Sequence, residues 1–361
     1  MFQQNFMLTD ILGIWIGFIL FPLVIIIPGY LAGYFLDIFN FRSRHFSTQL
    51  GISLLLSVAI SPIFYYLLTS LFSLKTAVVF TLIFLIAFIF ILFREKITVP
   101  TFYISKAILW ITCIWIVLAL FSLVDLQRGA DELYFSVVSY DHTTRVSIID
   151  AMTRTGVPPI NPSYYPGQYV KLTFLYFFWY ILGSIIDFIG GRFVDARAAL
   201  FASIIWCGIA LMACISFYLR QRNKYDQGKI WRQALIGILL LAVTGLDILP
   251  TIALMQVGNG AIGDLEHWNE QITAWVGSLL WAPHHIIALI TGIVAILLAQ
   301  SARGKEIKKQ VALFTFAGIA FASLVGLSIW VALVFVLFWG FWMFSIFIQK
   351  RRTLNFVADD F

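Results

Sequence analysis

The sequence is poor in charged residues. Asp, Glu, Lys and Arg make up only 12% of its 361 residues, whereas hydrophobic residues make up 61% and the mean hydropathy is +0.93. Soluble domains carry about 25% charged residues, so this composition excludes an ordinary soluble fold and indicates a membrane protein. The net charge of +6 comes from short basic clusters between apolar runs. Such clusters are typical of membrane topology signals and argue against a nucleic-acid-binding role.

Cysteine is also scarce. The three cysteines, Cys113, Cys207 and Cys214, all lie in apolar runs, which excludes a disulfide framework and a Cys/His zinc-site spacing. The sequence has neither a dinucleotide-binding GxGxxG after a strand nor a phosphate-binding GxxxxGK[ST]. No cofactor is therefore certain, and a divalent cation, Mg²⁺ or Mn²⁺, is left as an open alternative.

Long apolar stretches are abundant. A stretch of about 17 to 25 apolar residues can cross the hydrocarbon layer as a helix. The predicted stretches are residues 11–35, 47–71, 76–93, 107–124, 170–188, 198–219, 234–255, 286–300, 311–327 and 330–348. The first is too long and too rich in Pro, Gly and aromatic residues for a cleaved signal peptide, so we expect it to be retained.

The basic clusters predict which stretches cross. Lys and Arg gather at residues 42–44, 94–106, 220–232, 303–309 and 350–352, and the positive-inside rule places all five on the cytoplasmic side. Between residues 106 and 220 the three stretches are an odd number, so one of them does not cross. We assign residues 170–188, which begin near Lys171 and end near Asp187, to an amphipathic or partly buried outer helix rich in aromatic residues.

The predicted fold is therefore all-α: a polytopic protein of the cell membrane with about nine transmembrane helices. The N-terminus is expected outside and the C-terminus in the cytoplasm. A large outer loop, residues 125–197, carries interfacial helices, and a second outer segment covers residues 256–285. We divide the chain into N-terminal helices (1–105), a core (106–302), and C-terminal helices with a short cytoplasmic tail (303–361).

The large outer loop holds most of the candidate chemistry. It offers Asp131 and Glu132, then Asp141, His142 and Arg145, and then an amphipathic helix through Ile148, Ile149 and Met152 that Gly156 and the following prolines end. Carboxylates and a histidine beside a membrane surface suit activation of a nucleophile, or hold a cation against a phosphate. The alternative for Asp141 and Arg145 is a surface ion pair worth about 0.3 to 0.5 kcal/mol.

The order of these features resembles a known family. An outer loop that begins with acidic residues is followed by the Gly156-Val157-Pro158-Pro159 break, an aromatic helix and the Arg-containing turn 191–197. This order is similar to the GT-C membrane glycosyltransferases, which include protein O-mannosyltransferases, oligosaccharyltransferases and aminoarabinose transferases. The likeness is to bacterial and archaeal branches with a D-x-x-x-[HR] element and a PP-x-NP segment, here residues 141–145 and 158–162. It covers residues 107–300.

The resemblance implies a polyprenyl-phosphate-linked sugar as donor and a loop carboxylate as catalytic base or metal ligand. Asp141 is the leading match for that carboxylate, with Asp131 and Glu132 second. His142 and Arg145 would then contact acceptor or phosphate, and Arg192 and Arg197 are further phosphate candidates because a guanidinium matches phosphate oxygens. Three helices precede the matching region, and the chain stops after only about six spans of the family's core, so a truncated or inactive relative stays open.

The second outer segment adds His284 and His285 beside Trp281. The pair either completes an acceptor or phosphate site or forms a polar cap in the interfacial tryptophan belt. Adjacent helical residues point to different faces, so we do not expect both to bind one ion. Asp247, in an apolar run, is a separate candidate because an intramembrane carboxylate is costly.

Two other classes of function stay open. A transporter or lipid flippase would line a pathway with intramembrane charges, but the sequence shows no internal repeat and its polar residues gather on one predicted face. A non-catalytic membrane subunit would use the aromatic C-terminal region as a partner surface, for which contact with lipid is the plainer explanation. We favour the glycosyltransferase, with membrane lipids and the lipid-linked sugar as its partners.

Overall fold

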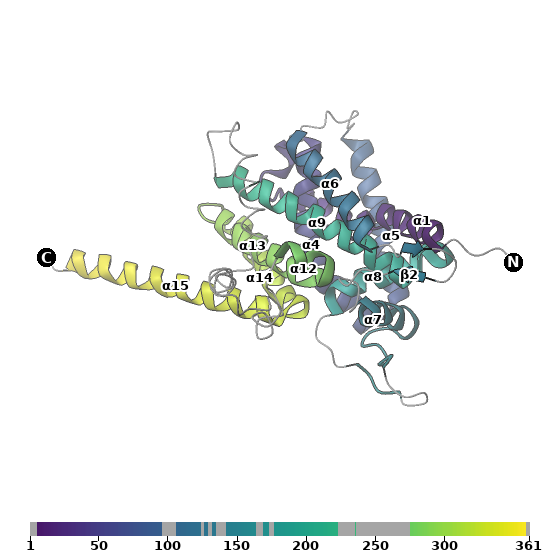
Figure 1. Ribbon diagram of the computed structural model, residues 1–361. Helices are drawn as coiled ribbons and strands as arrows, with labels where there is room; N and C mark the ends of the chain where they lie inside the picture. Colours follow the sequence, from purple (N-terminus) through teal and green to yellow (C-terminus); the bar gives the residue numbers. More distant parts are fainter. Residues whose placement is uncertain are drawn as a thin grey trace, which may run out of the picture.

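The computed structural model describes residues 6–95, 106–123, 126–128, 132–134, 142–163, 169–172, 177–222, 235 and 275–358 (Figure 1). Within these residues the chain is mainly helical, and one short antiparallel ladder pairs β1 (Leu126–Arg128) with β2 (Glu132–Tyr134). The helices are α1 (Phe6–Leu20), α2 (Pro22–Ile25), α3 (Ile27–Leu36), α4 (Phe46–Leu71), α5 (Leu74–Arg94), α6 (Lys106–Leu123), α7 (His142–Thr155), α8 (Phe177–Gly190), α9 (Ala196–Arg222), α12 (Trp275–Trp281), α13 (Pro283–Ser301), α14 (Ile307–Leu327) and α15 (Ile329–Ala358). The all-α prediction is confirmed.

Six helical stretches in the described residues are long and apolar enough to cross a membrane: Ile11–Leu36, Phe46–Leu71, Leu74–Arg94, Ala196–Leu219, Pro283–Ser301 and Ile307–Leu327. Each coincides with a stretch predicted from the sequence. Two shorter apolar helices, Leu109–Leu123 and Ile329–Ser345, match two more. The predicted stretch 234–255 lies outside the described residues except for Leu235. The chain is therefore a multi-pass membrane protein.

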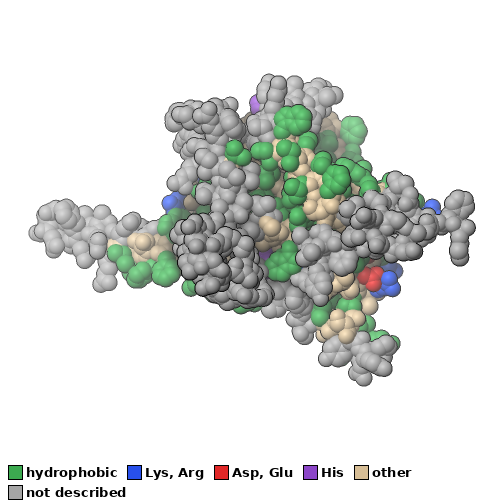
Figure 2. Space-filling view, viewed as in Figure 1, with side chains coloured by type: hydrophobic (Ala, Val, Ile, Leu, Met, Phe, Trp, Pro, Cys, Tyr) green, Lys and Arg blue, Asp and Glu red, His purple; other side chains and the backbone are tan. Residues whose placement is uncertain are grey.

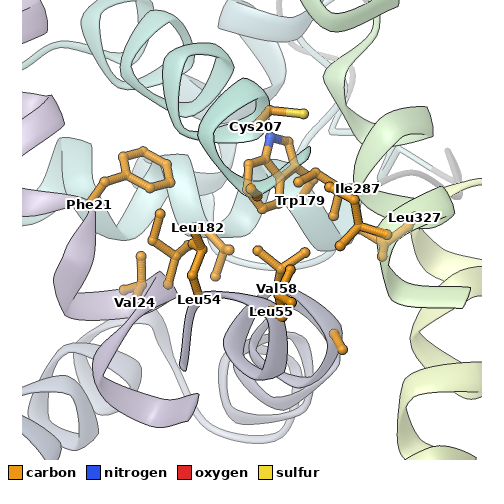
Figure 3. Packing of buried hydrophobic residues seen from close by; sticks show 14 of the residues in the cluster. Phe21, Val24, Leu54, Leu55, Val58, Trp179, Leu182, Cys207, Ile287 and Leu327 are labelled. Carbon is orange, nitrogen blue, oxygen red and sulfur yellow. The ribbon is translucent and has the colours of Figure 1, made fainter. Parts of the chain in front are cut away.

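Helix α4 lies at the centre of the bundle, packed against α3, α8, α9, α13 and α14. Figure 3 shows Leu54, Leu55 and Val58 of α4 facing Trp179 and Leu182 of α8. Close approach to α3 depends on Gly29, whose backbone N–H donates to Ser57 Oγ at 2.6 Å. A Cβ at Gly29 would fall 2.0 Å from the Ser53 carbonyl oxygen, so only glycine fits between these two helices.

A proline interrupts α4 near its middle. Pro62 has no N–H, so it leaves the Val58 carbonyl without its usual partner within the helix. Thr291 Oγ1 of α13 donates to that carbonyl at 3.4 Å. A neighbouring helix thus satisfies the freed backbone group, as the absence of water at this depth requires.

The predicted outer helix differs from its expectation in burial. It begins at Phe177 as α8, while Lys171 pairs as an isolated bridge with Ile160. All residues from Trp179 to Ile186 are buried, and α8 packs against α1, α4, α7, α9 and α14. Its polar residues Tyr180, Ser184 and Asp187 are spaced at i, i+4 and i+7 and so share one face. That face is covered as well, because Tyr180 binds His284 and Asp187 accepts from Thr153. At 14 residues α8 is about 21 Å long, shorter than the roughly 30 Å hydrocarbon layer.

Basic residues from three segments meet at one end of the bundle, which we call the basic end (Arg42, Arg94 and Lys309). Lys309 Nζ lies 3.3 Å from Asp37 Oδ2, which joins the start of α14 to the end of α3. Arg42 donates to the carbonyls of Tyr34 at 2.7 Å and Phe35 at 3.0 Å, and so caps α3. The charge of Arg94 also acts on Tyr34, whose hydroxyl donates to Glu95.

Helices α13 and α15 take different paths relative to the bundle. Helix α13 is about 28 Å long and runs from its first residue, Pro283, toward the basic end, where α14 begins. Helix α15 leaves the bundle and extends away from it (Figure 1), and its apolar side chains from Leu333 to Phe347 are largely exposed. Among the side chains that Figure 2 colours by type, hydrophobic ones are many and charged ones few, as expected for a surface in contact with lipid.

Candidate functional site

A group of buried polar side chains lies at the end of the bundle where α13 begins. It is formed by His142 and Arg145 of α7, Tyr180 of α8, Trp281 of α12, and His284 and His285 of α13; we call it the histidine cluster. The exposed fractions of the three histidines are only 3%, 5% and 6%, and that of Tyr180 is 1%. Polar groups are costly to bury unless they are hydrogen-bonded, so the partners of this cluster define it.

His284 and His285 are held by partners from two different segments, α8 and the junction between α14 and α15. Tyr180 Oη lies 2.8 Å from His284 Nδ1, and Ser328 Oγ lies 2.8 Å from His285 Nδ1. The two imidazole rings pack with centroids 4.1 Å apart. Adjacent residues leave a helix in different directions. The two imidazole rings nevertheless turn toward each other, because both bind groups inside the bundle.

His142 begins α7 and reaches across to α12. Its Nε2 lies 2.8 Å from the carbonyl oxygen of Leu280, and its ring meets Phe201 of α9 edge-on with centroids 5.7 Å apart. A carbonyl oxygen accepts only, so we assign the proton of this ring to Nε2, which leaves the lone pair of the neutral form on Nδ1. The contact fixes the start of α7 against the end of α12.

Arg145 lies one turn after His142 and is half-buried. Its guanidinium carbon stands 5.7 Å from the ring centroid of Trp281, a distance at which a cation is attracted by an indole face. The positive charge of Arg145 also acts on both His284 and His285. One permanent cation thus faces two imidazoles and an aromatic ring.

The structure brings together four of the residues predicted to bind substrate: His142, Arg145, His284 and His285. Arg197 lies beside them, because its guanidinium stands 5.1 Å from the ring of Phe201, the same ring that His142 meets. Arg192 is exposed and stacks on its neighbour Phe193 at 4.8 Å, away from these contacts. Arg145 carries a guanidinium, and His284 and His285 each have a second ring nitrogen, Nε2, besides the Nδ1 that binds Tyr180 or Ser328, so these three side chains suit an anion such as a phosphate.

Only one of the carboxylates predicted to act in catalysis lies within the described residues. Asp131, Asp141 and the intramembrane candidate Asp247 lie outside the described residues, so the predicted pairing of Asp141 with Arg145 does too. Glu132 opens strand β2, where its backbone is opposite Arg128. In the part of the chain that the structure describes, no three His, Cys, Asp or Glu side chains come close enough to hold a metal ion.

Sequence reasoning missed two members of the histidine cluster, Tyr180 and Trp281, as well as their neighbour Ser328 and, two turns further along α8, Asp187. Tyr180 and Ser328 lie in apolar segments with no motif, and only the fold brings them to the histidines. Trp281 was assigned to an interfacial belt. Asp187 was used only to mark the end of a helix, although a carboxylate at the end of a strongly apolar run itself indicates a functional site.

Asp187 lies between α7 and α8. Thr153 Oγ1 donates to its Oδ2 at 2.6 Å. Burial raises the pKa of Asp187 to about 6; the Thr153 hydrogen bond opposes that change, and the nearby carboxylates Asp150 and Asp195 add to it. The group therefore titrates close to the pH range of cells.

No protein-family model, no curated protein and no solved structure matches this chain. The residues and their geometry are therefore the basis for the function proposed below.

Proposed function

We propose that the chain is a membrane glycosyltransferase that moves a sugar from a polyprenyl-phosphate-linked donor to an acceptor at the outer face of the membrane. The observation that supports this most is the histidine cluster: Arg145, Tyr180 and buried imidazoles gathered at one end of a bundle of membrane-length helices. Such a site binds the phosphate of a lipid whose chain stays in the bilayer.

We also propose the topology that this function requires. About nine spans place the N-terminus outside and the C-terminus in the cytoplasm, with residues 125–197 and 256–285 as outer segments. The meeting of Arg42, Arg94 and Lys309 at the end of the bundle remote from His284 supports this orientation. The short length of α8 supports its assignment as a helix that does not cross.

Single cysteines at Ser139, Ser163, Gly191 and Gln227 in a Cys-free protein test the topology. An impermeant thiol reagent on intact cells should label the first three and leave Gln227 unlabelled. Labelling of Ser139 and Ser163 without labelling of Gly191 would mean that α8 crosses the membrane. The assignment of residues 125–197 to a single outer loop would then be wrong.

In the proposed reaction the acceptor oxygen bonds to the anomeric carbon of the sugar while the bond from that carbon to the phosphate oxygen breaks. Arg145, with His284 and His285, holds the polyprenyl phosphate that leaves, and stabilises its negative charge. A loop carboxylate takes the hydroxyl proton of the acceptor, directly or through a bound divalent cation. Asp141 directly precedes His142 in the sequence and is the leading candidate, with Asp131 and Glu132 second. Arg197 and Arg192 lie further from the phosphate in this scheme.

Release of polyprenyl phosphate from a panel of polyprenyl-phosphate-linked hexoses, in membranes that contain the protein, tests the function. Arg145→Gln should slow release about 100-fold or more, the scale expected when a charge-stabilising donor is removed. Arg154→Gln is the matched control, because Arg154 lies on the same helix, is 74% exposed and pairs with Asp150 in an i,i+4 contact. Equal release by both variants, or no release by the natural protein from any donor, contradicts the proposal.

The base has its own test in the same assay. Asp141→Asn should abolish release if Asp141 takes the acceptor proton. If Asp141→Asn and Asp131→Asn each left transfer intact, the assignment of the base would be wrong, while the phosphate site would stand.

A further inference from the structure

An apolar groove runs along the surface of the bundle between α3, α4, α5 and α14. Its volume is about 640 Å³, within the range of about 300 to 1,000 Å³ that is usual for ligand sites. Its walls include Ala32, Phe64, Ala87 and Phe316, and the only hydroxyl in its lining is that of Ser61. The groove shares no residue with the histidine cluster.

The groove lies at hydrocarbon depth. All four helices around it are candidate spans. Its lining covers residues 28–36 of α3 and 60–67 of α4, about 12 Å and 10 Å of helix. Gly29, at the start of the α3 stretch, bonds to Ser57, which lies one turn before the α4 stretch. The two stretches therefore follow one another along the length of the bundle. Water is absent at this depth, so a hydrocarbon chain is the occupant that the walls fit.

One end of the groove adjoins the basic end. Phe35 lines the groove, and its carbonyl accepts from the exposed guanidinium of Arg42 at 3.0 Å. Lys309 follows nearby, paired with Asp37, and both side chains are about one-third exposed at 32% and 33%. The three cations Arg42, Arg94 and Lys309 face two carboxylates, Asp37 and Glu95. The balance is positive, and it favours a phosphate at this mouth.

We propose that the groove binds one acyl chain of an anionic glycerophospholipid, whose phosphate lies at Arg42 and Lys309. The chain runs from Leu36 past Ala32 and Ala87 to Phe64. The lipid fills the space between α3 and α14 and joins these helices. This site is independent of the proposed sugar transfer.

Native mass spectrometry of the detergent-purified full chain tests the proposal, with phosphatidylglycerol and phosphatidylcholine of identical acyl chains as probes. The natural protein should keep phosphatidylglycerol in preference to phosphatidylcholine. Ala32→Trp, which fills the groove, should abolish the lipid adduct, and Ala87→Phe should do the same from another helix. Ala322→Trp is the matched control, because Ala322 is an exposed residue of α14 that does not line the groove.

Charge at the mouth is tested separately. Arg42→Gln should weaken the preference for phosphatidylglycerol about fivefold, as expected for one basic residue near a lipid phosphate. Arg42→Lys keeps the charge and should keep the preference, although it loses the two carbonyl contacts. Lys75→Gln, at the exposed start of α5 away from the basic end, should change nothing. Ser61→Ala should leave the adduct in place, since the chain makes no hydrogen bond there.

Four results would overturn the proposal. Equal retention of the two lipids would show that the head group is not recognised, and an adduct that survives both groove-filling variants would place the lipid elsewhere. A dimer that Ala32→Trp dissociates would make the groove a contact between copies of the chain. Displacement of phosphatidylglycerol by polyprenyl phosphate would assign the groove to an isoprenoid chain instead.

Discussion

Tyr180 and Tyr34 form a matched pair at the two ends of the bundle, since each joins its own helix to a side chain of another. Tyr180 is 1% exposed and binds the imidazole of His284 at 2.8 Å. Tyr34 is partly exposed and donates to the carboxylate of Glu95. If the first contact is lost, the buried imidazole nitrogen has no water to replace the phenol, whereas Glu95 is exposed and can bind water. Loss of the Tyr180 contact is therefore expected to cost more than loss of the Tyr34 contact.

The carboxylates of the two ends differ in the same way. Burial raises the pKa of Asp187, and the hydroxyl of Thr153 is too weak a partner to reverse that change. Burial would also raise the pKa of Asp37, but the backbone N–H of Arg42 and the ammonium of Lys309 outweigh it and hold that pKa below its usual value. One end therefore favours a neutral acid and the other favours a charged one.

The largest effect is expected for the tyrosines. Tyr180→Phe should lower the free energy of unfolding by about 1 to 3 kcal/mol, because it leaves a buried imidazole nitrogen without its partner. Tyr34→Phe should cost less than about 1 kcal/mol, since water replaces the hydroxyl. Unfolding of the two variants in the same detergent measures the difference. Equal losses would mean that the ends do not differ as described.

The carboxylates should produce opposite dependences on pH. The pKa of Asp187 is higher in the folded state, so its contribution to stability is full below about pH 4 and is lost as the pH rises through about 6. The pKa of Asp37 is lower in the folded state, so its contribution is present above about pH 4 and is lost below it.

Unfolding of Asp187→Asn and Asp37→Asn across pH 3 to 7 separates the two contributions. Asp187→Asn should flatten the fall in stability between about pH 4 and 6, and Asp37→Asn should flatten the loss below that range. One pKa unit corresponds to about 1.4 kcal/mol, and partial exposure reduces the effect of Asp187 to about 1 kcal/mol. If Asp187→Asn left the profile unchanged, Asp187 would not be neutral near pH 5 in the folded protein.

The smallest effect is expected for the ion pair of the basic end. Lys309→Met should lower the free energy of unfolding by about 0.2 to 1 kcal/mol, because both side chains of the pair with Asp37 are partly exposed. The loss should shrink as the salt concentration rises. Lys308→Met, at the exposed neighbouring position, is the control. A loss above 2 kcal/mol would mean that water cannot replace the contact of Lys309, just as it cannot replace that of Tyr180.

Much of this fold follows from hydrophobic run length alone. A run of apolar residues such as 47–71 has to be a helix in a bilayer, because only a helix satisfies its own backbone there. The end of α7 was predictable too, since Gly156 adopts a φ of +82° and prolines follow it. The burial of α8 was not predictable, because an aromatic apolar helix reads alike whether it lies at an interface or inside a bundle.

The candidate site was also predictable only in part. The polar residues His142, Arg145, His284 and His285 stand out in an apolar chain, so the sequence by itself determined that this is a multi-pass helical protein and which of its residues were worth following. Only the tertiary structure decided that these four meet, and that Tyr180 and Ser328 complete their contacts. Run length and charge act locally along the chain, whereas a hydrogen bond between residues 180 and 284 depends on how α8 packs beside α13.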